Sequence, residues 1–302
     1  MPVSKNRRKG RQKAKTKAKP KNSIDELSKT IFDAVMFEFP DASEEDEANG
    51  GSDDLSRAQD LVFDAWEAPT KRARVAIARN ALELSEDCAD AWTLLAEEGA
   101  KGLVDRLRYY ENAVEAGKRA IGERAFVEDV GYFWGLLETR PYMRARVGLA
   151  DSLWNLGQRQ EAVEHLKDML RLNPHDNQGI RSILAAYLLF LHRLDEAEAL
   201  LKDYEDEDFA QWCFDRALLL YMKNGKSSKE ALSALHKALT VNPYVADYLL
   251  ENRRIPNAQP EGYMLGTREE AILYTVYSSA AWRNAEGSLI WLSENLDPKL
   301  DL

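Results

Sequence analysis

The stretch LADSLWNLGQRQEAVEHLKDMLRLNP, residues 149–174, decides the fold. Its Glu-Ala dipeptide recurs at a regular spacing, at 161–162, 196–197 and 230–231. The two steps between these copies are 35 and 34 residues long. The Asn-Pro pair that ends the stretch returns 69 residues later, at 242–243, which is about two such steps. The sequence therefore contains an internal repeat with a period of about 34 residues.

Each repeat has the residues expected of a helical hairpin. Gly157 lies between two helical segments, where the turn needs a backbone conformation that a side chain opposes. The small residues Ala150 and Ala162 allow the two helices to approach closely. Pro174 and Pro243 end the second helix, because proline cannot continue the hydrogen-bond ladder. A period of this length with helix–turn–helix character is typical of tetratricopeptide repeats.

We therefore predict an all-α fold, a tetratricopeptide-type α-solenoid of about five to six helical hairpins. The alternative is a helical bundle without repeats, but the turn, the small residue and the stop recur in phase, which favours the solenoid. Near the C-terminus, Thr267-Arg-Glu-Glu270 is a capping box that predicts a helix through about Trp282. A last helix is expected between Ala285 and Leu296.

Two different segments precede the repeats. Residues 1–22 hold ten Lys/Arg and no Asp, Glu or aromatic residue, and are expected to be disordered because they bury little apolar surface. Ser23-Ile-Asp-Glu26 is a capping box, and apolar residues at four-residue spacing from Leu27 to Phe39 predict a short amphipathic helix. Residues 41–54 contain seven acids and no basic residue, which predicts a flexible linker. The predicted parts are thus the basic tail 1–22, the helix and acidic linker 23–54, and the repeat domain 55–302.

The charges are distributed unevenly. The chain has 41 Lys/Arg and 51 Asp/Glu, so removal of the ten tail cations leaves 31 against 51, a net charge of −20 for the rest. An acidic body joined to a basic tail is informative about the binding partners of the protein, but not about its fold. Cys88 and Cys213 form no CxxC pair, which indicates a reducing compartment. The longest uncharged run, Ser182–Leu191, is about half of a membrane span, and no apolar segment follows the first cations, so we expect a cytoplasmic protein.

Several segments carry a resemblance beyond the repeat. They are NPYVADYLLE at 242–251, GTREEAILY at 266–274, Ala281-Trp282, EGSL at 286–289 and, earlier, CADAWTLLAEE at 88–98. These segments resemble the suppression-of-tumorigenicity seven protein family, and the resemblance covers about residues 55–296. It implies a helical repeat scaffold without established chemistry.

The same resemblance is informative about membrane association and about the type of organism from which the protein comes. Animal members of that family carry hydrophobic membrane segments before the repeats. This chain has the basic tail and the acidic linker there instead, so we do not expect membrane association. Residues 138–146 and 172–181 are similar to those of uncharacterised soluble bacterial relatives, which favours a bacterial cytoplasmic protein and adds no reaction.

No local motif for catalysis or metal binding occurs in the sequence. The four histidines, His165, His175, His192 and His236, are scattered singly, without an HxxxH, HExxH or Cys/His ligand set. A phosphate-binding glycine loop and a GxSxG elbow are also missing. Acids at 44–47 lack the spacing of a calcium loop. We predict a protein that is not an enzyme and needs no cofactor or metal, while an active site built from residues distant in sequence stays open.

The first helices of stacked repeats line a concave groove. Counted from Met143, the repeat positions that face such a groove give a candidate partner site. The predicted groove residues are Arg140, Arg144, Asp151, Trp154, Asn155, Gln178 and Arg181. Arginine, tryptophan and amide side chains suit interfaces, so we predict a scaffold or adaptor that binds an extended or helical peptide, including one that carries acids. The alternative is that Arg140 and Arg144 pair with Glu138 or Asp151, and that Trp154 belongs to the core.

The basic tail suggests a second function. Its candidate nucleic-acid contacts are Arg7, Arg8, Lys9, Arg11, Lys13 and Lys15. No aromatic residue is interleaved with them, so weak, non-specific phosphate contact is favoured over base stacking. The alternative function is thus a nucleic-acid- or ribosome-associated factor anchored by its tail. Other interpretations are a solvated tail that folds back on the acidic linker, or a nuclear address in a eukaryote.

Overall fold

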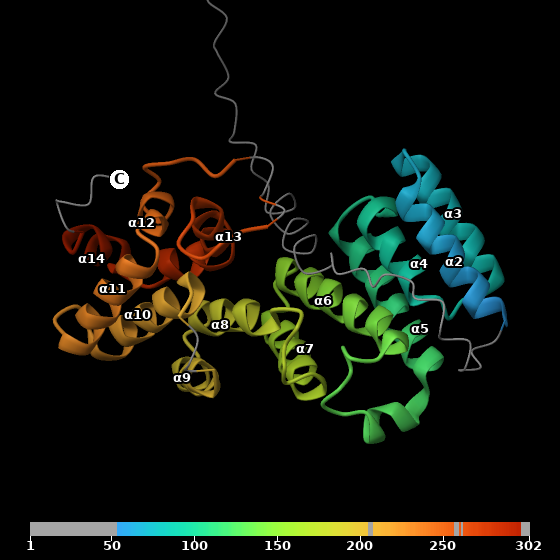
Figure 1. Cartoon of the computed structure of the whole chain (residues 1–302), viewed down its shortest axis with the longest axis horizontal. Coiled ribbons are helices and arrows are strands. Elements are labelled where there is room, and N and C mark those ends of the chain that lie inside the picture. The colour runs from blue at the N-terminus through green and yellow to red at the C-terminus, as the bar shows by residue number, and fades with distance from the viewer. Residues whose placement is uncertain (1–52, 205–207, 257–259, 261, 297–302) are drawn as a thin grey trace, which may run out of the picture.

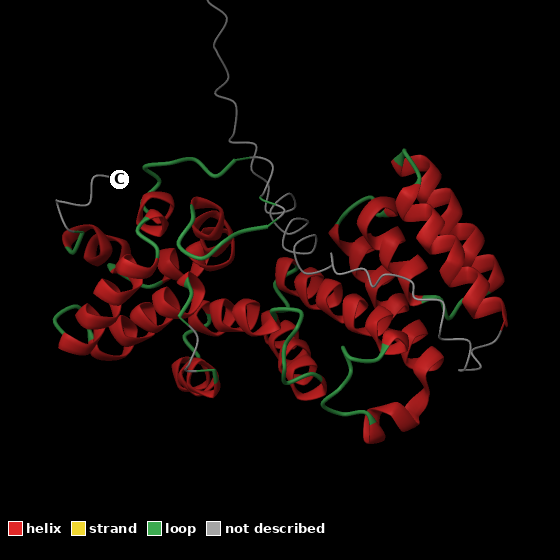
Figure 2. Ribbon diagram, viewed as in Figure 1, coloured by secondary structure: helices red, strands yellow, loops and turns green. Residues whose placement is uncertain are grey.

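The computed structural model describes residues 53–204, 208–256, 260 and 262–296. All regular structure in these ranges is helical, and they contain no strand (Figure 2). The predicted all-α fold is therefore confirmed. The basic tail and the amphipathic helix expected from Ser23 lie outside the described residues, as does the acidic linker except for its last two positions, which begin the first helix.

Five consecutive hairpins form the body of the protein. They are α2 (Asp53–Glu67) with α3 (Lys71–Leu84), α4 (Ala89–Leu94) with α5 (Leu103–Glu128), α6 (Arg140–Asn155) with α7 (Arg159–Leu172), α8 (Ile180–Phe190) with α9 (Leu194–Asp203), and α10 (Ala210–Asn224) with α11 (Lys229–Val241). The second helix of each pair contacts the first helix of the next, so the hairpins lie side by side (Figure 1). This is the predicted solenoid. A π-helical turn, Leu95–Gly99, extends α4, and a 3-10 turn, Leu137–Thr139, precedes α6.

The turns inside the hairpins use left-handed backbone, as the repeat pattern predicts. Gly157 has φ 85° between α6 and α7, and Gly225 has φ 80° between α10 and α11. His192 stands at the equivalent turn between α8 and α9 with φ 57°, a conformation that costs a side-chain-bearing residue more than it costs glycine. Asn173 and Asn242 follow the last residues of α7 and α11, each directly before the expected proline. Proline disfavours helical backbone at the preceding residue, which explains why both helices end there.

Close helix contact depends on small residues. Ala150 and Ala162 are almost fully buried, as predicted. The tightest approach is at Gly148 on α6. A Cβ atom added to Gly148 would lie 2.1 Å from the ring of Tyr110 on α5. Tyr110 is completely buried and cannot move aside. Gly148 therefore sets the distance between the second and third hairpins.

The array ends in three helices, α12 (Tyr244–Leu249), α13 (Arg268–Asn284) and α14 (Ser288–Glu294). α13 begins where the capping box predicts, since the side chain of Thr267 accepts a hydrogen bond from the backbone N–H of Glu270. α14 is shorter than the last helix expected from the sequence. The long helix α13 packs against α8, α10 and α12, so it closes the C-terminal part of the core.

Substitution of Gly148 tests the close approach. We expect Gly148→Ala to lower the free energy of unfolding by at least about 2 kcal/mol, because the added carbon overlaps a buried ring. The control is Gly102→Ala, where an added carbon meets no atom within 4 Å and the backbone is extended. Urea unfolding followed by circular dichroism measures both variants. Equal stability of the two would contradict the packing described above.

Candidate partner-binding surface

The inner side of the C-terminal hairpins is covered by the chain itself. α8 and α10 are the first helices of their hairpins, and α13 packs against both. Figure 1 places α9, the second helix of its hairpin, on the opposite side of α8 from α13. First helices line the inner face of such arrays. The face that a partner would enter is thus already occupied by a helix between α8 and α10.

Glu270 fixes the start of α13. Its buried carboxylate accepts hydrogen bonds from the backbone N–H of Ala210 at 2.8 Å, from Asn242 Nδ2 at 2.9 Å and from the N–H of Gly266 at 2.6 Å. In a regular capping box this carboxylate would turn back to the N–H of Thr267. Here it instead joins the beginning of α10 to the end of α11. The sequence motif located the helix start correctly, whereas the partners of its acid are tertiary.

A second buried carboxylate, Asp215 on α10, holds the middle of α13. Gln211 Nε2 donates to its Oδ2 at 2.6 Å, and Tyr274 Oη on α13 donates to its Oδ1 at 3.1 Å. Trp282 Nε1 in turn donates to Tyr274 Oη at 2.7 Å, and Gln211 also reaches Ser278 at 2.8 Å. Burial raises the pKa of Asp215 to about 7, although the hydrogen bonds from Gln211 and Tyr274 act against this rise.

The predicted groove residue Arg144 forms an ion pair inside the array. Its Nε donates to Asp90 Oδ1 at 3.0 Å, and its Nη2 donates to Asp90 Oδ2. Asp90 lies on α4, is fully buried, and also accepts from Gln59 of α2 at 3.0 Å. The row of Gln59, Asp90 and Arg144 thus connects three first helices. Pairing of Arg144 with a carboxylate was the alternative to partner contact, but the acid is Asp90 rather than Glu138 or Asp151.

Asp151 and Asn155 form a second group on α6. Asp151 is 5% exposed and pairs with Arg106 of α5 at 3.0 Å. Asn155 Nδ2 donates to the backbone oxygen of Asp151 at 3.0 Å and to its carboxylate at 3.1 Å. Burial and then the charge of Asp151 raise the pKa of Tyr277 on α13, which places the two side chains near each other. Asp151 was expected to face a partner, but its burial makes it a support beneath the surface.

The remaining predicted residues lie in separate environments. The Trp154 ring stacks on Tyr187 of α8, with ring centroids 3.5 Å apart and planes inclined by 7°. Trp154 is half-buried, so it closes the junction between α6 and α8 in the manner of a core residue. Arg140 Nε donates to the backbone oxygen of Trp134 at 2.9 Å, and its guanidinium lies over that ring.

Gln178 and Arg181 belong to the loop before α8 and to its first turn. Gln178 is 2% exposed, so its side chain is enclosed by the packing around it. Arg181 lies 4.8 Å from the ring of Tyr204, the residue that follows α9, and 3.8 Å from Asp176. The seven predicted residues therefore lie in several separate places. They do not form one continuous surface.

Sequence reasoning missed an exposed apolar loop beside α13. Tyr263, Met264 and Leu265 are 50%, 75% and 66% exposed, although they are consecutive and apolar. Tyr263 also raises the pKa of Tyr277, so this residue of the loop lies near Tyr277, as Asp151 does. The signal in the sequence was an apolar triplet between Gly262 and Gly266, outside any helical period.

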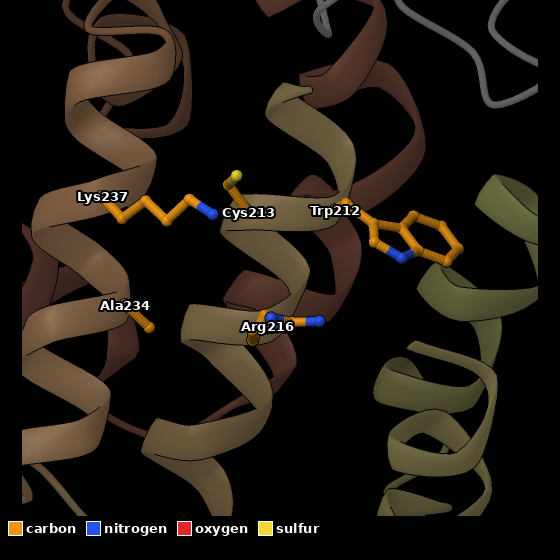
Figure 3. Close-up of a pocket in the computed structure, with 5 residues that line it drawn as sticks. All are labelled: Trp212, Cys213, Arg216, Ala234 and Lys237. Atoms are coloured by element: carbon orange, nitrogen blue, oxygen red, sulfur yellow. The ribbon is translucent and has the colours of Figure 1, made fainter. Parts of the chain in front are cut away.

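No cluster of metal-ligating side chains is found in the described part of the chain. It contains no group of three or more His, Cys, Asp or Glu able to hold a metal ion. The hollow in Figure 3 lies beside Cys213 and measures about 20 Å³, which is room for a single water molecule. It is lined by Trp212, Cys213, Arg216, Ala234 and Lys237. Burial raises the pKa of both thiols, that of Cys88 to about 12, so both stay protonated near neutral pH.

Comparison with known proteins adds a family. Residues 48–299 match the family described as ST7 protein. The chain belongs to this family. Suppressor of tumorigenicity 7 protein-like from Gallus gallus is 30% identical over 264 residues, which cover 78% of this chain and 46% of that protein. The Homo sapiens protein of the same description is 30% identical over 266 residues, covering 78% and 45%. The chain thus spans just under half the length of these relatives.

One solved structure with a similar arrangement is that of YrrB, described as a TPR protein with an unusual peptide-binding site. It is 21% identical, covers 63% of this chain and 86% of YrrB, and has a TM-score of 0.41. Among the helices that the structure describes, none is both long and apolar enough to cross a membrane. The predicted nucleic-acid tail, from Arg7 to Lys15, lies outside the described residues.

The buried Asp215 predicts a pH-dependent stability. Its pKa is raised from 3.8 to about 7 in the folded protein, so above about pH 4 the folded state keeps a proton that the unfolded state releases. The stability contributed by this group therefore falls as pH rises to about 7 and is constant above. Relative to Asp215→Asn, the parent should lose at most about 4 kcal/mol over this range.

Urea unfolding at several pH values measures the difference between the parent and Asp215→Asn. The exposed Asp203 on α9 provides the control, because Asp203→Asn should follow the parent at every pH. Parallel curves for the parent and Asp215→Asn would mean that burial does not hold the proton on this carboxyl.

Proposed function

We propose that this protein is a non-enzymatic interaction scaffold, or adaptor, that binds a segment of another protein on the inner face of its helical array. The observation that carries the proposal is the position of α13, a helix of the same chain that lies across α8 and α10. An inner face that accepts one helix has the shape and the apolar character needed for another. The buried, unpaired thiols of Cys88 and Cys213 support the cytoplasm as its setting.

The partner surface that we propose is the part of the inner face beyond α13, formed by α4 and α6 and bordered by residues 262–265. Arg144 is paired with buried Asp90, and Arg106 is paired with Asp151, so these cations mainly hold helices together. The adjoining loop offers exposed apolar side chains at Met264 and Leu265. Adjacent apolar residues of this exposure favour an amphipathic helix as the partner segment, rather than a strongly acidic peptide.

Substitution of the loop tests this proposal. We expect Met264→Ser with Leu265→Ser to abolish partner capture, because it removes apolar contact area without disturbing a buried residue. Ile290→Ser is the matched control, since Ile290 is 64% exposed but lies on α14. A photo-reactive amino acid placed at position 264 or 290, followed by mass spectrometry, measures which proteins bind directly. The same crosslinks from both positions, or capture unchanged by the double substitution, would reject this surface.

The basic tail remains a separate candidate for nucleic-acid contact. The observation that favours it is the concentration of ten cations in residues 1–22, ahead of an acidic body. Deletion of residues 2–22 should remove RNA retention at low salt, since phosphate contacts depend on these charges. Filter binding of a random RNA over a range of salt concentrations measures this. The Met264 and Leu265 variant serves as the control and should bind RNA as the parent does; equal retention after the deletion excludes a role for the tail.

A further inference from the structure

A cleft of about 670 Å³ lies between α5 and the hairpin of α6 and α7. None of the predicted groove residues lines it. α5 is broken at Gly122, where the backbone has φ 76° and ψ 161°, and Gly122 itself borders the cleft. Val114, Phe126 and Tyr142 supply an apolar, largely aromatic lining. Volume and composition both fall within the range of sites that bind small molecules or single side chains.

The polar wall of the cleft is built on Arg146, which is only 5% exposed. Its Nη1 donates to Tyr142 Oη at 2.6 Å and to Asp168 at 3.0 Å, and its Nη2 donates to the backbone oxygen of His165 at 3.2 Å. Its Nε has no hydrogen-bond partner among the described residues. Asp168 forms ion pairs with both Arg146 and Arg171. A buried guanidinium with an unsatisfied N–H and a shared counter-ion is stabilised by a further anion.

His165 indicates the sign of the electrostatic potential at this wall. Burial lowers its pKa to about 4, and the charges of Arg146 and Lys118 act in the same direction, against Asp168. The imidazole is therefore neutral near pH 7. The charges of Arg146 and Lys118, which disfavour the imidazolium, also disfavour a positively charged ligand at this wall. Lys118 is exposed and pairs with the exposed Glu115, and a surface ion pair of this kind costs little to exchange for a ligand.

We propose that this cleft binds a carboxylate that carries a neighbouring apolar or aromatic side chain. The carboxylate lies beside Lys118, His165 and Arg146, and the apolar group covers Phe126 and Tyr142. Glu115 and Glu123 also line the cleft and are exposed, so a polyanion such as nucleic acid is repelled at its edge. The C-terminal residue of a peptide has this chemistry, and so does an acidic side chain next to an aromatic one.

Calorimetric titration of the full chain with three probes tests the proposal. N-acetyl-phenylalanine carries a terminal carboxylate, N-acetyl-aspartyl-phenylalanine amide carries a side-chain carboxylate, and N-acetyl-phenylalanine amide is neutral. We expect saturable one-to-one binding of at least one carboxylate probe, at least tenfold tighter than that of the neutral amide. The preferred carboxylate probe identifies the source of the ligand. Equal binding of all three probes, or no saturable binding of either carboxylate, overturns the proposal.

Charge reversal locates the binding. Lys118→Glu should weaken the preferred probe at least tenfold, because it places a second negative charge at the wall while leaving the buried residues unchanged. Lys202→Glu is the control, since Lys202 is exposed on α9, away from the cleft, and should bind as the parent does. Equal affinity of Lys118→Glu and the parent overturns the proposal, as does an equal loss in both variants.

Nuclear magnetic resonance of the histidine side chains gives a second readout. A bound carboxylate stabilises the imidazolium form, so saturation with the preferred probe should raise the pKa of His165 measurably from its value of about 4. The exposed His192 and His236 do not line the cleft, so they serve as internal controls whose resonances should not respond to the probe. A pKa of His165 that does not respond to a saturating probe places the binding elsewhere and rejects this cleft. These readouts do not involve residues 262–265, so they succeed or fail independently of the proposed scaffold surface.

Discussion

A helical hairpin buries only one apolar side by itself, and this constraint shapes the whole molecule. Each hairpin covers its second apolar side with the next one, so the body grows as a row from α2 to α11. The row still leaves the inward side of its first helices without a cover. In the C-terminal half that side is closed by α13, which brings large aromatic residues such as Trp282 into complete burial.

Buried carboxylates stand at the joints of this row. Asp90 joins α2, α4 and α6, Asp151 joins α5 and α6, and Asp215 and Glu270 join α10 to α13. Each has charged or hydrogen-bonding partners on another helix, which offsets the cost of taking it out of water. Since such groups tolerate only a few geometries, we infer that they select one relative placement of the helices. The acidic character of the body is therefore partly a feature of its interior.

Much of the fold was readable from the sequence because it depends on local rules. The period of about 34 residues, Gly157 at a turn, and the asparagine–proline pairs after α7 and α11 all act within a few residues of where they stand. The start of α13 followed from its cap in the same way. Local rules do not describe which side of the row a later helix chooses, so the position of α13 was not foreseen.

The candidate site was less readable for a related reason. Repeat positions indicate which side chains point inward, but not which of them a neighbouring helix has already engaged. Arg144 pairs with an acid 54 positions earlier in the chain, and Gln178 is enclosed by packing. The apolar loop around Met264 is the reverse case, an exposed segment that the repeat positions did not predict. Its exposure depends on its tertiary placement and not on any sequence period. The cleft beside Gly122 lies at a break inside α5. The apolar residues on both sides of this break keep a helical spacing, so the sequence pattern does not predict it.

The contact of α13 with α8 also affects how the chain reaches its native state. Asn284 donates a hydrogen bond to the backbone oxygen of Phe190 at 2.7 Å, across 94 residues of sequence. Solenoids in general connect only neighbouring units and can grow one unit at a time. Here the inward sides of α8 and α10 are covered by α13, which comes later in the chain, so the fourth and fifth hairpins depend on it for their full burial. Long-range closure of this kind slows folding and couples the units, so the C-terminal half forms as one cooperative block instead of in separate steps.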